Sequence, residues 1–159
     1  MAAEPARSIG WVPQRPAIYG RLSARENIEL FARLEGLPAA AGIAGRMIRE
    51  VELSDDGKLA AQLSAGNQQR LNLAIALVGD PDMLLLDEPI ASLDPRQRRR
   101  LWELAAAVRD RGGAVVFATQ NLEELDRFAD RVVVLIDGEL VFTGSPEEYA
   151  GAPEATAFA

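Results

Sequence analysis

Residues 63–95 read LSAGNQQRLNLAIALVGDPDMLLLDEPIASLDP, and they restrict the possible folds more than any other part of the chain. Apolar residues recur at helical spacing from Leu71 to Val78. Met83–Leu86 is apolar at every position, a pattern typical of a strand covered on both faces in a parallel sheet. Pro95 fits the first turn of another helix, with Asp94 as its N-cap. A helix, a buried strand and a helix in succession predict an α/β fold.

The rest of the chain continues this alternation. Ser23-Ala24-Arg25-Glu26 has the form of a capping box, so a helix is expected to begin there and to end near residues 36–38. Asp137-Gly138 is a strong two-residue hairpin signal. We therefore expect a mostly parallel sheet with flanking helices and an appended antiparallel hairpin. The other expected elements are strands at Ile9–Val12, Ala114–Ala118 (buried), Arg131–Ile136 and Glu139–Thr143, and helices at Ala39–Leu53, Gly66–Val78, Pro95 to Gly112-Gly113, Asn121–Phe128 and from Ser145 onward.

Composition excludes several classes of function. The chain has 159 residues, 48% of them hydrophobic, which suits one globular domain with a proper core. Its net charge of −7 argues against nucleic acid as the main partner. No apolar run approaches the ~20 residues of a membrane-spanning helix, and the opening MAAEPARS lacks the apolar core of a signal peptide, so a cytoplasmic location is expected. Without Cys or His, disulfides, thiolate metal sites and histidine-based mechanisms are excluded.

Two positions carry residues suited to metal and phosphate chemistry. Asp87 ends the apolar strand, so its carboxylate is expected at the carboxyl edge of the sheet, where ligand sites of α/β proteins form and where Mg²⁺ would find oxygen ligands. Ser64, Ala65 and Gly66 place a hydroxyl and free backbone amides at the start of a helix, which favours an anion. Each feature also has an ordinary explanation. Residues 87–89 would then be a solvated strand end, and Ser64 would be a plain helix N-cap.

Five short motifs follow one another in a fixed order along the chain. They are Val12-Pro13-Gln14, Leu63–Asn67, Met83–Pro89, Ser92-Leu93-Asp94 and Ala118-Thr119-Gln120. In this order they resemble the Q-loop, LSGGQ signature, Walker B strand, D-loop and H-loop of the ATP-binding subunit of an ATP-binding cassette (ABC) transporter. The resemblance extends from about Ile9 to Tyr149. It implies a partial P-loop NTPase fold that includes a helical subdomain.

The resemblance also implies roles for single residues. Asp87 and Gln14 would contact Mg²⁺, and Glu88 would polarise the water that attacks the γ-phosphate of ATP. Gln120 would hydrogen-bond that phosphate in place of the family's His. Asp94, besides capping a helix, would act across a dimer. The signature turn would contact the ATP held by the opposite subunit through Ser64, Ala65, Gly66 and Asn67.

Several positions depart from the family pattern. Ala65 replaces a Gly and Asn67 a Gln within the signature. Gln120 can donate a hydrogen bond but cannot carry charge, so slow or absent hydrolysis is expected even in an otherwise complete site. No segment has the form G-x-x-x-x-G-K-[ST], because the single lysine, Lys58, is followed by Leu59. We therefore predict that this chain alone does not bind ATP normally.

The resemblance organises the chain as a single incomplete ABC ATPase domain over residues 1–159. Residues 15–80 would hold the Q-loop, the helical subdomain and the signature helix, and residues 81–150 the Walker B, D-loop and H-loop region. Residues 151–159 are expected to fray. Without the strand and helix that flank the family's phosphate loop, residues 83–86 and 114–118 would lack part of their cover. We expect the chain to be poorly stable or sticky when expressed alone.

Three interpretations of function follow. The first is the C-terminal part of an ABC ATPase subunit, shortened by an internal start or a disrupted gene, whose family couples ATP hydrolysis to transport, here export. Its expected partners are a second ATP-binding subunit and a transmembrane permease contacted through the Q-loop and helical region, at the inner face of the cell membrane. The second is a non-catalytic partner that donates its signature turn to another subunit's ATP. The third is an ATPase of the same superfamily without a membrane partner.

Overall fold

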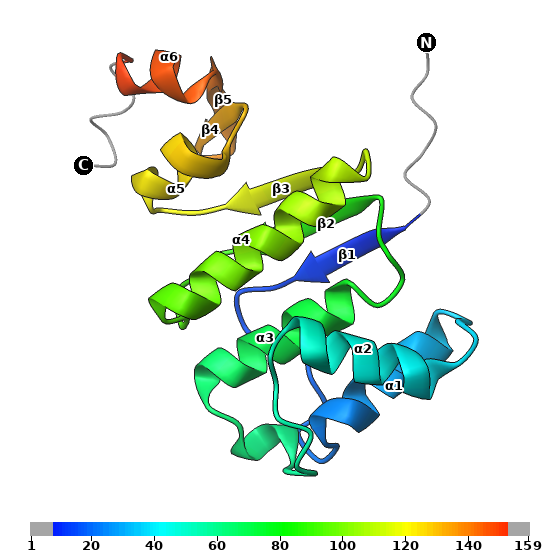
Figure 1. Ribbon diagram of the computed structural model, residues 1–159. Helices are drawn as coiled ribbons and strands as arrows, with labels where there is room; N and C mark the ends of the chain where they lie inside the picture. Colours follow the sequence, from blue (N-terminus) through cyan, green and yellow to red (C-terminus); the bar gives the residue numbers. More distant parts are fainter. Residues whose placement is uncertain (1–7, 153–159) are drawn as a thin grey trace. The chain divides into compact units, whose positions relative to one another are not determined.

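The computed structural model describes residues 8–152, which form two compact units divided between Ala118 and Thr119. The first unit contains three strands and most of the helices (Figure 1). The C-terminal residues 153–159, most of the segment expected to fray, lie outside the described residues. The elements of the first unit are β1 (Ile9–Val12), α1 (Ala24–Leu34), α2 (Ala40–Glu50), a 3-10 turn η1 (Ala60–Gln62), α3 (Ala65–Ala76), β2 (Met83–Asp87), α4 (Pro95–Asp110) and β3 (Ala114–Ala118).

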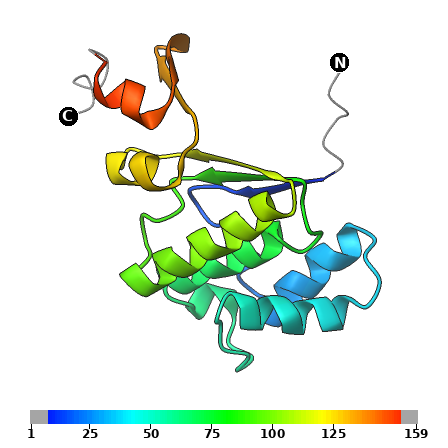
Figure 2. The same cartoon turned by 45° about the horizontal axis from the view of Figure 1, so that its top comes forward.

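The first unit is built on a parallel three-stranded sheet in the order β1-β2-β3. Helices α3 and α4 lie along one side of this sheet (Figure 2). Val12, Leu84 and Leu86 are buried there with the apolar side chains of the helices. The mostly parallel α/β sheet with flanking helices is therefore confirmed.

The opposite face of the sheet is open, which corrects the expectation of strands buried on both faces. Ile9, Trp11 and Val116 lie on this face, with 58%, 60% and 54% of their surface exposed. Buried and half-buried residues alternate along β2, and exposed and half-buried ones along β3. An apolar run shows that a strand is hydrophobic but not how many of its faces are covered. The exposure agrees with the expected partial loss of cover over residues 83–86 and 114–118.

Helices α1, α2 and α3 pack against one another to form the helical region. The capping box at the start of α1 is present, with the Ser23 hydroxyl accepting from the Glu26 amide and the Glu26 carboxylate accepting from the Ser23 amide. Helix α2 is shorter than the expected span 39–53, because Ala39 and Glu52 take left-handed backbone, with φ of 59° and 54°. Among residues 8–152, no helix is long and apolar enough to cross a bilayer.

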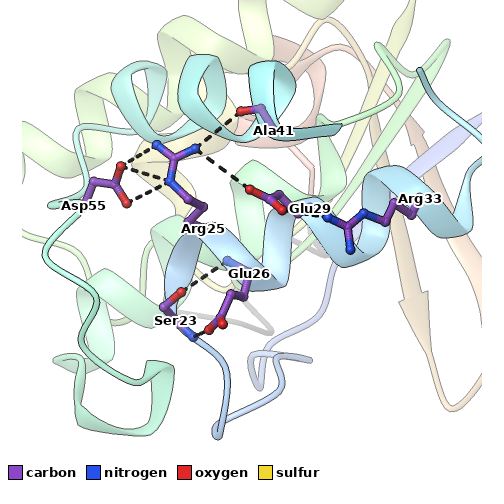
Figure 3. Close-up of polar contacts among 7 residues, drawn as sticks. All are labelled: Ser23, Arg25, Glu26, Glu29, Arg33, Ala41 and Asp55. Atoms are coloured by element: carbon purple, nitrogen blue, oxygen red, sulfur yellow. Dashed lines mark hydrogen bonds and ion pairs between the residues drawn. The ribbon is translucent and has the colours of Figure 1, made fainter. Parts of the chain in front are cut away.

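Arg25 joins three parts of the helical region (Figure 3). Its guanidinium makes hydrogen bonds to both carboxylate oxygens of Asp55, in the segment after α2, and donates to the carbonyl of Ala41 at 3.4 Å. Glu29, one turn along α1, lies 4.0 Å from Arg25 and accepts from Arg33 at 2.9 Å. The hydrogen bond from Arg25 lowers the pKa of the Asp55 carboxyl. These side chains link α1 to both ends of the α2 segment on the surface.

Replacing Arg25 with methionine is expected to raise the pKa of Asp55, because the hydrogen bond that lowers it is removed. In the native chain, this bond stabilises the fold at pH values above the pKa that the Asp55 carboxyl has in the unfolded state. This stabilisation is lost as the pH falls through the lower pKa of the folded state. Both side chains are exposed, so the free energy of unfolding should change little. An NMR titration of the Asp55 carboxyl carbon measures the shift. Arg33→Met, which loses only its contact with Glu29, is the control, and an unaltered Asp55 pKa in Arg25→Met would contradict the expectation.

The second unit is a β-hairpin with two short helices. It comprises α5 (Leu122–Phe128), β4 (Val132–Ile136), β5 (Glu139–Gly144) and α6 (Pro146–Ala150). The antiparallel pairing of β4 with β5 confirms the hairpin predicted from Asp137-Gly138, and both residues take left-handed backbone, with φ of 51° and 83°. Val132, Val134 and Tyr149 are buried together in this unit.

Candidate functional site

The carboxyl edge of the sheet brings three of the expected residues to one place. Asp87 is the last residue of β2, and Glu88 follows it directly. Gln14 lies two residues after Val12, whose partner in the neighbouring strand is Leu86. Because β1 and β2 run parallel, all three residues lie beyond the same edge of the sheet, where ligand sites of α/β proteins form.

The backbone at Glu88 is unusual. Its amide donates to the carbonyl of Ala118 at 2.9 Å, which extends the pairing of β2 with β3 by one step. Its φ of 45° lies in the left-handed region that few non-glycine residues adopt. Such conformations cost about 1–3 kcal/mol and cluster at functional sites. The side chains of Asp87 and Glu88 are both half-buried at the end of the strand.

Two buried asparagines hold the loop that contains Gln14. Asn72 on α3 accepts from the amide of Ala17 at 3.2 Å and donates to the carbonyl of Pro13 at 3.4 Å. Asn27 on α1 accepts from the amide of Tyr19 at 2.8 Å and donates to its carbonyl at 3.0 Å. Both side chains are almost fully buried. The loop after β1 is therefore anchored to two helices, while Gln14 itself is exposed.

Sequence reasoning missed these two asparagines, although a signal for them exists. Asn72 is the one polar residue in the stretch 71–78, every residue of which is buried. Asn27 lies three residues after the buried Ala24 and next to the buried Ile28, so it falls on the apolar side of its helix. A polar residue on a buried helix face needs a hydrogen-bond partner. Which backbone groups supply that partner depends on contacts across 8 to 59 residues of sequence.

The signature turn begins α3 and packs against the D-loop of the same chain. Ser64 is the N-cap and its hydroxyl accepts from the amide of Asn67 at 3.3 Å. Gly66 is buried, and a Cβ there would lie 2.8 Å from the side-chain oxygen of Gln97 and 3.0 Å from the carbonyl of Ser92. A side chain at position 66 would therefore require the Gln97 side chain to move and the backbone at Ser92 to shift slightly. Ser64 and Ala65 are exposed beside it.

The expected capping role of Asp94 is confirmed. Its carboxylate accepts from the amide of Gln97 at 2.9 Å, and the Gln97 side chain accepts from the amide of Asp94 at 3.2 Å. Pro95 occupies the first turn of α4, as expected. Since Gln97 also lies against Gly66, one side chain connects the start of α4 to the signature turn.

Gln120 belongs to the second unit. It is exposed and precedes Asn121, the N-cap of α5, whose side chain accepts from the amide of Glu123 at 3.0 Å. Thr119 accepts from the amide of Asn121 at 3.0 Å and donates to the carboxylate of Glu124. The turn around Gln120 is thus fixed by bonds within its own unit.

Lys58 does not resemble a phosphate-binding lysine in the structure. It is exposed and pairs with Asp56 at 2.9 Å in the turn that precedes η1. The 159 residues hold no other lysine, so the interpretation of this segment as a surface turn agrees with the structure.

The residues at the sheet edge fit a magnesium ion. Asp87 offers a carboxylate and Gln14 an amide oxygen, and Mg²⁺ prefers oxygen ligands while retaining several waters and binding substrate phosphates. Within residues 8–152, no group of three or more His, Cys, Asp or Glu side chains is placed so that it could hold a metal ion by itself. Asp87 and Gln14 thus carry oxygen atoms of the kind that Mg²⁺ prefers, and its remaining ligands would be waters and phosphates.

Comparison with known proteins places the chain in a family. The family model described as ABC transporter matches residues 1–91, more than half of the chain. Phospholipid-transporting ATPase ABCA7 of Homo sapiens is 38% identical over 157 residues, which is 95% of this chain and 7% of that protein. Daunorubicin resistance ATP-binding protein DrrA3 of Streptomyces coeruleorubidus is 38% identical over 143 residues, 88% of this chain and 45% of that protein. The chain thus spans less than half the length of either relative.

Solved structures agree with the sequence matches. A dimeric ATP-binding cassette in a post-hydrolysis state, bound to ADP and Pi, has a TM-score of 0.78 and 28% identity, covering 87% of this chain and 63% of that one. The ATP binding subunit of an ABC transporter has a TM-score of 0.81 and 26% identity, covering 91% and 62%. The chain therefore belongs to the ABC transporter family, within its nucleotide-binding domain.

Proposed function

We propose that this chain is the C-terminal part of an ABC ATP-binding subunit that powers export. The family couples ATP hydrolysis to transport. Export is supported by the relatives named for phospholipid transport and for daunorubicin resistance. The proposed partners are a second ATP-binding subunit and a transmembrane permease that contacts the anchored loop 13–22 and the helical region, at the inner face of the cell membrane. One incomplete ATPase domain would comprise both compact units.

The roles proposed for the edge residues follow from their chemistry. Asp87 and Gln14 would hold Mg²⁺, which neutralises charge on the phosphates of ATP when bound. Glu88 would accept the proton of the attacking water. Gln120 would donate one hydrogen bond to the γ-phosphate, without the positive charge that a protonated His provides. The observation that carries this proposal is the placement of Asp87, Glu88 and Gln14 beyond one edge of a parallel sheet.

A second candidate function is favoured by the signature turn. Ser64 and Gly66 form a helix start that is packed against Ser92 of the D-loop, so both segments are held as one surface within the chain. The 159 residues contain no phosphate loop. As a non-catalytic partner, the chain would donate this surface to ATP bound by another subunit.

The two functions predict different responses to two substitutions. The chain alone is expected neither to bind Mg-ATP tightly nor to hydrolyse ATP above buffer, and tight Mg-ATP binding by a monomer would contradict this. Combined with a family cassette that carries its own phosphate loop, a signature donor should lose ATP-dependent association in Ser64→Ala and keep it in Glu88→Gln. In the first function, Glu88 serves an ATP site that is completed by a phosphate loop supplied in cis. Glu88→Gln should then lower the rate of ATP hydrolysis at that site about 100-fold or more. Sedimentation with Mg-ATP and phosphate release measure the two effects.

A further inference from the structure

Arg70, on α3, bridges the signature turn and the end of a different helix. Its Nη2 donates to Oδ1 of Asn67 at 2.5 Å. Its Nη1 donates to the carbonyls of Val51 and Glu52, at 3.0 and 2.7 Å. These carbonyls follow the last residue of α2. One half-buried guanidinium therefore connects a side chain of the signature turn to the C-terminal end of α2.

The contact with Arg70 determines how the Asn67 amide is oriented. A guanidinium only donates hydrogen bonds, so the group that Asn67 turns toward Arg70 must be its oxygen. The NH₂ group of Asn67 is then directed away from Arg70, and its two hydrogens are left for another acceptor. The other polar groups of the turn are the Ser64 hydroxyl and the first amides of α3, which also donate. With Asn67 in this orientation, its NH₂ group adds two donors to those of the Ser64 hydroxyl and the first amides of α3.

The anchor of Arg70 is itself held from a third helix. Arg100 on α4 donates through Nε to the carbonyl of Glu50 at 2.7 Å. Arg96, one turn earlier, forms an ion pair with the Glu52 carboxylate at 2.9 Å. The end of α2 is thus bonded to α4 as well as to α3. The two bonds of Arg70 to the Val51 and Glu52 carbonyls, which do not involve Arg100, restrict the rotamer of Arg70 and, through it, that of Asn67.

We propose that Arg70 is a positioning residue that fixes the Asn67 side chain with its NH₂ group toward a nucleotide phosphate held by another subunit. The nucleotide part of this inference rests on the proposed function. The orientation of Asn67 does not, because it follows from the hydrogen bonds of the chain itself.

The orientation is tested on the full 159-residue chain without nucleotide. The ¹⁵N heteronuclear NOE of the Asn67 side-chain amide should match that of the α3 backbone in the native chain and fall sharply in Arg70→Met. Arg100→Met is the matched control, because it also removes an arginine from the end of α2 but does not touch Asn67. An Asn67 amide that stays rigid in Arg70→Met, or that loosens equally in Arg100→Met, would overturn the proposal.

A conservative variant covers the case in which Arg70→Met does not fold, as judged by circular dichroism. In Arg70→Lys the ammonium keeps the charge but lacks the planar fork that joins Asn67 to the two carbonyls. Its Asn67 amide should be mobile while the helical content is retained. A folded Arg70→Lys chain with a rigid Asn67 amide would equally count against the proposal.

The nucleotide part is tested by a double-mutant cycle on Mg-ATP-dependent association with a cassette that carries a phosphate loop. Arg70→Met and Asn67→Ala should each weaken association about tenfold, and the double variant should weaken it no further, because Arg70 acts through Asn67. Asn67→Asp keeps the contact with Arg70 but presents a carboxylate to the phosphate, and it should weaken association more than Asn67→Ala. If the double variant instead loses affinity by the product of the two single losses, the proposal that Arg70 acts through Asn67 is refuted. If the native chain does not associate at all, the donor role in the proposed function fails, while the NOE measurement still decides the role of Arg70.

Discussion

Replacing Gly10 with alanine is expected to lower the free energy of unfolding of the first unit by about 3 kcal/mol, the upper end of the usual effect of overpacking. A Cβ at position 10 would lie 2.1 Å from the carbonyl oxygen of Ala76 and 3.1 Å from Cγ of Pro81. The first contact is with backbone at the end of α3, which no rotamer change can relieve. The substitution therefore forces β1 and α3 apart. It also displaces the loop that contains Gln14, because this loop follows β1.

Urea denaturation followed by circular dichroism measures this loss. Gly42→Ala is the matched control, because Gly42 lies within α2 and a Cβ there would meet no atom within 4 Å. An alanine at this position should stabilise the helix by about 0.5–1 kcal/mol. A Gly10→Ala chain that unfolds at the same urea concentration as the native chain would show that β1 and α3 are not in close contact.

The open face of the sheet is expected to make the isolated chain self-associate. Ile9 and Trp11 on β1 and Val116 on β3 lie on the same face of the sheet, on either side of β2, and exposed apolar surface of this kind promotes association. The double substitution Trp11→Gln with Val116→Thr should raise the monomer fraction strongly. Because both side chains are mostly exposed, the free energy of unfolding should change by only about 0.5 kcal/mol, whereas a buried Trp costs about 3–5 kcal/mol when truncated.

Analytical ultracentrifugation at several protein concentrations measures the monomer fraction. Leu34→Gln is the control, since Leu34 is 69% exposed on α1 and lies outside the sheet. Its substitution should leave association unchanged. A sharp, concentration-independent melt of the native chain as a monomer would argue against the role of the open face.

Local sequence signals predicted most of the fold. The alternation of helices and strands, the capping box at Ser23, the start of α4 at Pro95 and the hairpin at Asp137-Gly138 are all present in the structure. Each of these depends on residues within a few positions of one another. The order of the motifs likewise identified the family, which the comparisons confirm. The roles of Glu88, Gln120 and the other site residues stay predictions.

What the sequence could not supply depends on contacts between distant segments. The number of covered faces of β2 and β3 is decided by which elements pack on the sheet, and the apolar runs look the same in either case. The need for glycine at position 10 arises from the carbonyl of Ala76, in a helix far along the chain. The contacts of Arg70 with Val51 and Glu52 also join separate helices. No periodicity or motif encodes such pairings.

The anchoring of the loop by Asn27 and Asn72 has a consequence for local stability. A segment without regular structure usually opens at little cost, independently of the core. Here, freeing the loop removes the backbone partners of Asn72 and those that Tyr19 supplies to Asn27, a cost of about 1–3 kcal/mol for each group left unsatisfied. The loop and the two helices therefore form one cooperative unit. The irregular segment that contains Gln14 therefore shares the opening free energy of the core.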